Sequence, residues 1–220
     1  GYAATNDFPL PGPRETTLWS TILRMTVSNQ PVLSIQGVTN GVLEGVAITG
    51  ERQDVLRSTT KNSGAVYILN CANLTLASCM ITNNWVNQFG DAYGTAAYGC
   101  GVYSENTVLT LTNCVIADNQ GRMPGWAPPP YCGLSYGVGV YAKGSGLIQL
   151  YGCRLEGNWS YGGDQFGGGA QGVALYASCP VQMRNCLVSG NIQDINPNGA
   201  IYLSGGGTLE NCTVADNNTT

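Results

Sequence analysis

Residues that could carry out catalysis are few in this sequence of 220 residues, and histidine is absent. Without histidine the chain cannot form a Ser-His-Asp or Cys-His catalytic centre, a His-ligated zinc site or an imidazole general base. Asp118 and Asp216 occupy the same corner position in two copies of a repeated motif, but they lie three turns apart, which is too far for a carboxylate pair. We therefore predict no catalytic residue, no metal site and no cofactor.

Aromatic rings offer a second kind of chemistry, because they can stack on sugars or fill pockets in protein partners. Several lie in segments rich in Gly and Pro that separate the repeats, and insertions of this kind gather on one edge of a repeat protein. We predict a binding edge there. The alternative is that the rings pack on one another to hold long loops in place. The candidate binding residues are Trp85, Phe89, Trp126, Tyr131, Trp159 and Tyr161.

One tyrosine recurs at the same position of five successive repeats. The residue before each copy is aliphatic, so alternation along a strand places the aliphatic side chain inside and the ring outside. One interpretation is an aromatic ladder that covers the face of a sheet, and the other is a strip that stacks on sugars or contacts another chain. The column contains Tyr67, Tyr103, Tyr141, Tyr176 and Tyr202.

Nine cysteines are many for a reduced cytosolic protein and favour an exported, oxidising environment. No Cys-x-x-Cys pair occurs, so a zinc site built from four cysteines is not expected. Cys100 and Cys132 form the candidate disulfide. Five other cysteines recur with the repeat and should form an inward column of mostly reduced, buried thiols: Cys79, Cys114, Cys153, Cys186 and Cys212.

A repeat positions these residues. One seven-residue motif occurs five times. It begins with Asn, Ser or Gly, followed by Cys, any residue, an aliphatic residue, two further residues and Asn. Residues 44–50 form an earlier variant. Short stretches that alternate between apolar and polar residues precede most copies, such as 65–69 and 74–77, so each repeat should contain three strands. This arrangement describes one turn of a parallel β-helix. We predict an all-β solenoid of about six turns, with residues 21–220 as a single domain and residues 1–20 as an N-terminal arm or cap.

The register of the repeat predicts which side chains stack inside the solenoid. One inward column should contain Ile48, Ile81, Ile116, Leu155, Val188 and Val214, and a second should contain Leu43, Leu76, Leu111, Leu150, Met183 and Leu209. An asparagine ends each copy of the motif. We expect each amide to bond the asparagine of the next turn and each of these residues to adopt the left-handed conformation of a tight corner. The ladder is Asn84, Asn119, Asn158, Asn191 and Asn217.

The pattern resembles the right-handed parallel β-helix superfamily, which includes pectate lyases, tailspikes and many surface proteins. Within it, GAIY at residues 199–202 followed by VADN at residues 214–217 resembles the GGAI and FxxN repeats of polymorphic outer-membrane proteins and adhesin-like passenger domains. The resemblance implies a right-handed solenoid. It does not select an activity, because lyases, hydrolases, adhesins and scaffolds share this fold.

Charge and composition limit the function classes. The net charge is −4, with 9 basic against 13 acidic residues, so nucleic acid binding is not expected. No run of about 18 apolar residues occurs, so membrane insertion by this chain is not expected either. We predict a non-enzymatic structural or adhesive module that is extracellular or at the cell surface. The alternative is a carbohydrate-active enzyme (a polysaccharide lyase or hydrolase) or a glycan-binding module. Candidate glycosylation sites are Asn73 and Asn218.

Three kinds of partner are expected. No capping segment follows the last repeat, so the open strand edges favour self-association by end-to-end stacking into a filament or membership of a longer solenoid. Other surface proteins are the second kind of partner, and glycans are the third.

Overall fold

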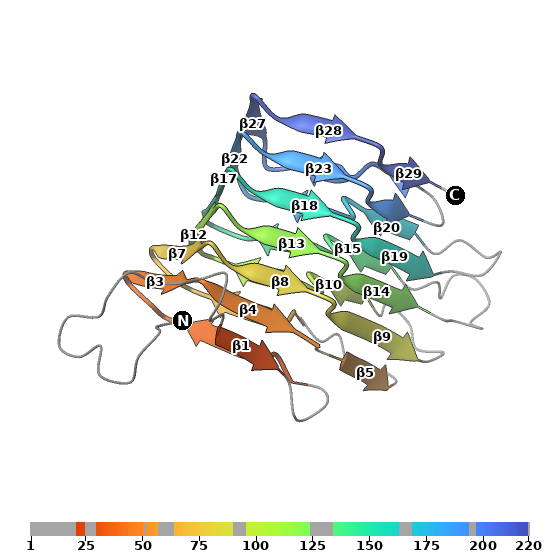
Figure 1. The fold of residues 1–220 in the computed structure, drawn as a ribbon, viewed down its shortest axis with the longest axis horizontal. Helices are drawn as coiled ribbons and strands as arrows, with labels where there is room; N and C mark the ends of the chain where they lie inside the picture. The colour runs from red at the N-terminus through yellow and green to blue at the C-terminus, as the bar shows by residue number, and fades with distance from the viewer. Residues whose placement is uncertain are drawn as a thin grey trace.

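The computed structural model describes residues 21–24, 30–50, 52–56, 64–89, 96–123, 134–162, 169–193 and 197–219. Every regular element within these residues is a β-strand, and all strand pairs are parallel. Equivalent strands from successive coils stack into continuous sheets, and in Figure 1 the front strands β8, β13, β18, β23 and β28 form one such tier of arrows that all run in the same direction. The prediction of an all-β parallel β-helix is therefore confirmed.

Three sheets enclose the main core. Sheet A contains β1 (Thr21–Arg24), β4 (Val46–Thr49), β8 (Met80–Thr82), β13 (Val115–Ala117), β18 (Arg154–Glu156), β23 (Leu187–Ser189) and β28 (Thr213–Ala215). Sheet B contains β2 (Leu33–Gln36), β6 (Val66–Leu69), β11 (Val102–Glu105), β16 (Val140–Lys143), β21 (Leu175–Ala177) and β26 (Ile201–Leu203). Sheet C contains β3 (Gly41–Glu44), β7 (Leu74–Ala77), β12 (Val108–Thr112), β17 (Leu147–Tyr151), β22 (Val181–Arg184) and β27 (Gly207–Glu210).

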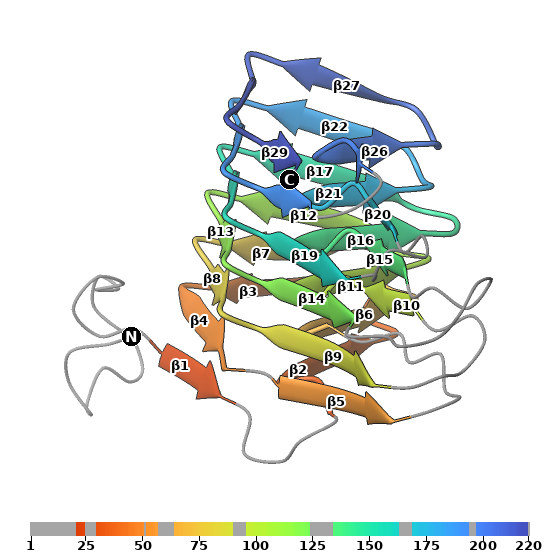
Figure 2. The ribbon, with the colours of Figure 1, turned by 90° about the vertical axis from the view of Figure 1, so that its right-hand side faces the viewer.

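Two further sheets extend each coil beyond this barrel. Sheet D contains β5 (Arg52–Leu56), β9 (Trp85–Phe89), β14 (Gln120–Met123), β19 (Trp159–Gly162), β24 (Ile192–Gln193) and β29 (Asn218–Thr219). Sheet E contains β10 (Ala96–Tyr98), β15 (Leu134–Tyr136), β20 (Gly169–Gln171) and β25 (Pro197–Asn198). Figure 2 shows the strands of sheet D stacked towards the viewer.

The prediction of three strands per turn is therefore too low, because segments that the sequence favours as loops form sheets D and E. The physical reason is a second, smaller core between the two sheets. Val86 of sheet D and Ala97 of sheet E are almost completely buried together with three residues of the segments between sheets E and B: Cys100, Val138 and Val173. Burial of this apolar surface stabilises the added strands.

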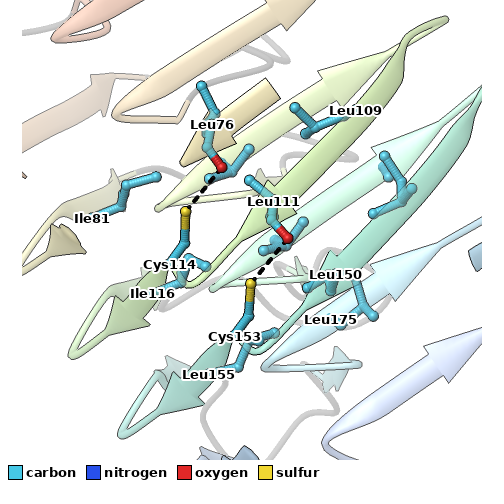
Figure 3. Packing of buried hydrophobic residues seen from close by; sticks show 14 of the residues in the cluster. Leu76, Ile81, Leu109, Leu111, Cys114, Ile116, Leu150, Cys153, Leu155 and Leu175 are labelled. Atoms are coloured by element: carbon cyan, nitrogen blue, oxygen red, sulfur yellow. Dashed lines mark hydrogen bonds between the residues drawn. The ribbon is translucent and has the colours of Figure 1, made fainter. Parts of the chain in front are cut away.

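The main core follows the predicted columns. Ile48, Ile81, Ile116, Leu155 and Val188 are completely buried, as are Leu76, Leu111 and Leu150 of the second column. Figure 3 shows part of both columns, with Cys114 and Cys153 on the same inward side as Ile116 and Leu155. Leu209 and Val214, in the last rung that the structure describes, are 45% and 49% exposed.

The corners contain residues with positive φ, but these are not the ladder asparagines. At the corner after sheet A, the residue immediately before each ladder asparagine adopts the left-handed conformation, with φ between 54° and 64°. The expectation that the asparagines themselves take this conformation is therefore wrong. Short polar residues and glycine tolerate it, which gives Asp118 and Asp216 a structural role. The corner column is Asn83, Asp118, Gly157, Gly190 and Asp216.

Candidate functional site

The predicted asparagine ladder is present and rigidifies the corner between sheets A and D. Nδ2 of Asn84 donates to Oδ1 of Asn119 at 2.9 Å, and the same bond links Asn119 to Asn158 at 2.9 Å. It continues through Asn191 to Asn217 at 3.0 and 2.8 Å. Each Nδ2 also donates to a main-chain carbonyl of the preceding rung. Between each pair of neighbouring rungs, the side-chain Nδ2 and Oδ1 atoms are taken up by hydrogen bonds. This column is therefore structural rather than a ligand site.

The cysteine column forms a second polar ladder inside the barrel. Sγ of Cys114 donates to the carbonyl oxygen of Leu76 at 3.2 Å, and Sγ of Cys153 donates to that of Leu111 at 3.2 Å, as Figure 3 shows. Hydrogen bonds to neighbouring thiols, followed by burial, raise the pKa of Cys79 and of Cys153. The protonated thiol is therefore the favoured form of these two residues, and it is not a nucleophile.

No disulfide joins two cysteines of the described part of the chain. The predicted pair cannot be placed, because Cys132 lies outside the described residues, whereas Cys100 is buried in the second core. The column from Cys79 to Cys212 is therefore a stack of reduced thiols, as the sequence predicts.

The tyrosine column is also a continuous stack. Its five rings lie in register on sheet B, with successive centroids 5.2, 5.4, 5.1 and 5.1 Å apart. Two more tyrosines, Tyr98 and Tyr136 of sheet E, pack against it and lie 4.8 Å and 6.5 Å from the ring of Tyr141. Tyr103 is completely buried and Tyr141 is only 8% exposed.

This packing decides between the two interpretations of the tyrosine column. A sugar needs a free ring face, and in the column each inner ring already shares both faces with its neighbours. Because these two rings are buried, the pKa of Tyr103 and of Tyr141 is raised. The hydroxyl of Tyr103 donates to Glu105 at 2.5 Å, and Glu105 also pairs with Lys143 at 3.4 Å. The column is therefore an aromatic ladder that joins sheets B and E.

The outward face of sheet D carries a different aromatic arrangement. Trp85 and Trp159 lie in one column with Gln120 between them, while Arg122 and Tyr161 lie side by side in the next. We call Trp85, Arg122, Trp159 and Tyr161 the aromatic strip. The rings of Trp159 and Tyr161 meet edge to face at 5.5 Å and 73°, and Tyr161 is 43% exposed.

Arg122 is the member of the strip that the sequence motifs do not single out. Its guanidinium carbon lies 5.5 Å from the ring centroid of Trp85 and 5.5 Å from that of Tyr161, so the cation is held by two aromatic rings. The sequence signal that identifies Arg122 lies in the segments that follow the ladder asparagines. Aligning residues 85–87, 120–122 and 159–161 places Arg122 beside Tyr161.

Three of the six predicted binding residues, Trp85, Trp159 and Tyr161, lie together in the strip. Phe89 ends β9, but its side chain is not among the parts that the structure describes. Trp126 and Tyr131 lie outside the described residues. The candidate glycosylation sites are both exposed, and Asn73 donates to Oδ1 of Asn40 at 3.2 Å.

The acidic side chains of the described residues do not gather into a site. Glu156 pairs with Arg154 at 2.8 Å and Glu210 pairs with Arg184 at 3.4 Å, both on outward faces. Across the described ranges, no group of three or more His, Cys, Asp or Glu residues could hold a metal ion. The same ranges contain no helix long and apolar enough to cross a membrane.

Comparison with known proteins agrees with this geometry. A family model described as a right-handed β-helix region matches residues 20–220. No curated protein and no solved structure matches the chain.

Proposed function

The chain belongs to the right-handed β-helix family, and on this premise we propose that it is a non-enzymatic structural and adhesive module of an extracellular or cell-surface protein. The observation that carries the proposal is the aromatic strip on the outward face of sheet D. Trp, Tyr and Arg are the residues that dominate binding interfaces, and here three rings and a guanidinium gather on one face.

The scaffold beneath the strip suits adhesion. The asparagine ladder begins at Asn84, immediately before β9, and its later members precede β14, β19, β24 and β29. The start of each of these sheet D strands is therefore held by hydrogen bonds to the neighbouring coils. A preorganised surface of this kind loses little conformational entropy when a ligand binds.

The described acidic residues support a binding module over a polysaccharide lyase or hydrolase. Glu105, Glu156 and Glu210 are engaged in ion pairs, while Asp118 and Asp216 occupy left-handed corners. A glycosidase requires two carboxyl groups that face one substrate bond. The aromatic strip contains no carboxylate. Adhesion is therefore the function that these residues serve best.

A structural role in a larger solenoid is the second part of the proposal. The inward-facing Leu209 and Val214 are about half exposed in the last described rung. Additional coils, supplied by further residues of a longer protein or by a second copy, would bury these side chains and pair the open strand edges. Light scattering of the purified chain over a range of concentrations tests the second-copy form. A monomer at every concentration would contradict that form.

Bead adhesion tests the proposal directly. Beads coated with the chain are washed over surfaces coated with acidic polysaccharide, neutral polysaccharide or extracellular matrix protein. We expect retention on at least one surface, and we expect the loss of that retention when Trp159 and Tyr161 are both changed to Ala. Beads carrying Tyr151→Ala, a change on the outward side of sheet C, are the matched control. Absence of retention on every surface, or cleavage of either polysaccharide, would contradict the proposal.

A further inference from the structure

We infer that Cys186 and Cys212 form a redox-active pair, which closes into a disulfide across two rungs of sheet A when the chain reacts with oxidised glutathione. This inference goes beyond the proposed adhesive function and does not rest on it. The two cysteines immediately precede β23 and β28, in which Leu187 pairs with Thr213. The amide of Thr213 donates to the carbonyl oxygen of Cys186 at 2.9 Å, so the parallel pairing of the two strands extends to the cysteines.

The spacing of the two cysteines suits a disulfide. Residues in register on neighbouring parallel strands lie about 4.8 Å apart, and disulfides join Cα atoms that are about 4.4–6.8 Å apart. A hydrogen bond from Cys153 lowers the pKa of Cys186 against the effect of burial, and a hydrogen bond from Cys212 lowers it too. The thiols of Cys186 and Cys212 are therefore already in contact, and the thiolate that attacks a disulfide is favoured at Cys186.

Access distinguishes this pair from pairs further along the cysteine column. Cys212 is partly exposed, and Cys186 beside it is 3% exposed. Cys79 and Cys114 are equally in register but are only 1% and 0% exposed. A dissolved disulfide can therefore reach the column at Cys212, whereas the packed core shields Cys79 and Cys114.

Freedom to rotate is the second distinction. Side chains in register point the same way, so a disulfide requires one sulfur to turn towards the other. Sγ of Cys114 is held by bonds to two carbonyl oxygens, at 3.2 and 3.4 Å. For Cys212, the bond described is to one carbonyl oxygen, that of Glu210 at 3.3 Å. Val214, which follows it on β28, is 49% exposed, so packing does not confine this part of the rung.

The reaction proceeds by two thiol–disulfide exchanges. The thiolate of Cys212 attacks one sulfur of oxidised glutathione, the S–S bond breaks, and one glutathione leaves as a thiolate and takes up a proton. The thiolate of Cys186 then attacks Sγ of Cys212 and releases the second glutathione. Two protein thiols are oxidised, and one oxidised glutathione is reduced to two glutathione molecules.

The disulfide would hold β28 against β23. It would close a loop of the chain and so restrict local unfolding of the last described rung. In an oxidising environment the pair would remain closed. Hydrogen exchange of the β28 amides should therefore slow after oxidation and recover after dithiothreitol is added.

Oxidation of the full chain tests the inference. The reduced chain is incubated with oxidised glutathione in native buffer and alkylated, and its peptides are identified by mass spectrometry. Trypsin cleaves after Arg184 and endoproteinase Glu-C after Glu210, so residues 185–210 and 211–220 each carry one cysteine. We expect a disulfide to join these two peptides and two free thiols to be lost from each chain. No disulfide should join Cys79 to Cys114.

Two variants separate the roles of the two cysteines. Cys212→Ser changes a partly exposed side chain, so it should fold, and it should prevent both the cross-link and the attachment of glutathione. Cys186→Ala removes the second nucleophile, so glutathione should remain attached to Cys212. Cys179→Ala removes a buried cysteine outside the column and is the matched control, in which the cross-link should still form.

Three results would overturn the inference. They are a full set of free thiols after oxidation, a disulfide that leaves Cys186 and Cys212 free, and β28 amides that exchange equally fast with and without the cross-link. Cys212→Ser keeps the test decisive if Cys186→Ala does not fold, because loss of two thiols in Cys212→Ser would also contradict the pair.

This inference and the proposed function fail separately. A second copy stacked on the last described rung would cover Cys212, so oxidation is measured at the lowest concentration used for light scattering. Formation of the cross-link without bead retention would support the pair and contradict adhesion. Bead retention without the cross-link would leave adhesion in place and overturn the pair.

Discussion

The two aromatic arrays of this β-helix are built on sheets B and D, which sheet E separates along each coil, and they differ in one respect. On sheet B a tyrosine occurs at five successive rungs, and the rings stack face to face. On sheet D aromatic residues alternate with Gln120 in one column and adjoin Arg122 in the next. In a solenoid, a side chain repeated at every rung stacks on or hydrogen-bonds to its copies in the neighbouring rungs. A side chain that interrupts the column is left to contact something else.

The asparagine ladder is the strongest case of a repeated residue, and breaking it should have the largest effect. The amide of Asn119 takes part in four hydrogen bonds, with Asn158, Ile81 and both nitrogens of Asn84. Asn119→Ala should lower the free energy of unfolding by about 4 kcal/mol, because buried partners lose their bonds. Urea denaturation provides the measurement.

Asn217 is the matched control, because it lies in the last described rung of the ladder and is only partly buried. Water can replace its bonds, so Asn217→Ala should cost about 1 kcal/mol. Equal losses for the two variants would show that the ladder does not act through burial.

The corners of sheets B and E should give the next largest effect. Gly137 has φ +52°, and a Cβ at that position would collide with the carbonyl oxygen of Val140 in the same coil. Gly137→Ala should therefore lower the free energy of unfolding by about 3 kcal/mol. Gly37 has φ +66°, but no atom lies within 4 Å of the place that a Cβ would occupy, so Gly37→Ala should cost only about 1 kcal/mol. If urea denaturation gave similar stability losses for the two variants, the positive φ alone, and not the collision of the Cβ, would explain the loss.

The buried tyrosines should make stability depend on alkaline pH. Burial raises the pKa of Tyr103 and of Tyr141 above 10.0, so the folded state resists losing these protons. Below pH 10 these tyrosines are protonated in both the folded and the unfolded chain, so their full contribution to stability is present. Above that pH the unfolded chain ionises first, and stability falls by about 1.4 kcal/mol per pH unit for each such tyrosine.

The double variant Tyr103→Phe/Tyr141→Phe should flatten this alkaline loss, since phenylalanine does not titrate. Tyrosinate absorbance, followed alongside circular dichroism, gives the measurement. Full ionisation of all 12 tyrosines while the circular dichroism spectrum stays native would contradict the buried ladder.

Chemical modification of the cysteine column should have the smallest effect on the native protein. Cys79, Cys114, Cys153 and Cys186 are buried, whereas Cys212 is partly exposed. Maleimide should therefore modify Cys212 faster than the other four in native buffer and modify all five after denaturation. Mass spectrometry of peptides identifies each site. Rapid native labelling of Cys114 would show that the core opens.

The repeated parts of this molecule can be predicted from the sequence and the irregular parts cannot. Asn119, Cys114 and Tyr103 recur at fixed offsets, so their columns follow from aligning the repeats. The sequence favours loops where sheets D and E form, because their strands are short and the matching positions hold unlike residues such as Trp85 and Gln120.

The position of Arg122 illustrates the same limit for the site. Its partner rings belong to β9 and β19, and only the strand register brings them beside it. The left-handed corner shows the limit for the backbone, because the sequence predicts it at Asn119 and the structure has it one position earlier, at Asp118. Both asparagine and aspartate tolerate that conformation, so composition alone does not separate them.

One pair of variants tests the central claim that repeated rings stabilise and interrupting rings bind. Tyr176 stacks on both neighbouring rings of the column at 5.1 Å, whereas Tyr161 is in the strip and 43% exposed. Urea denaturation and bead retention on the coated surfaces are measured for each alanine variant. Tyr176→Ala should lose about 3 kcal/mol of stability and retain adhesion, while Tyr161→Ala should retain stability and lose adhesion. The reverse pattern, or the same pattern for both variants, would contradict the account.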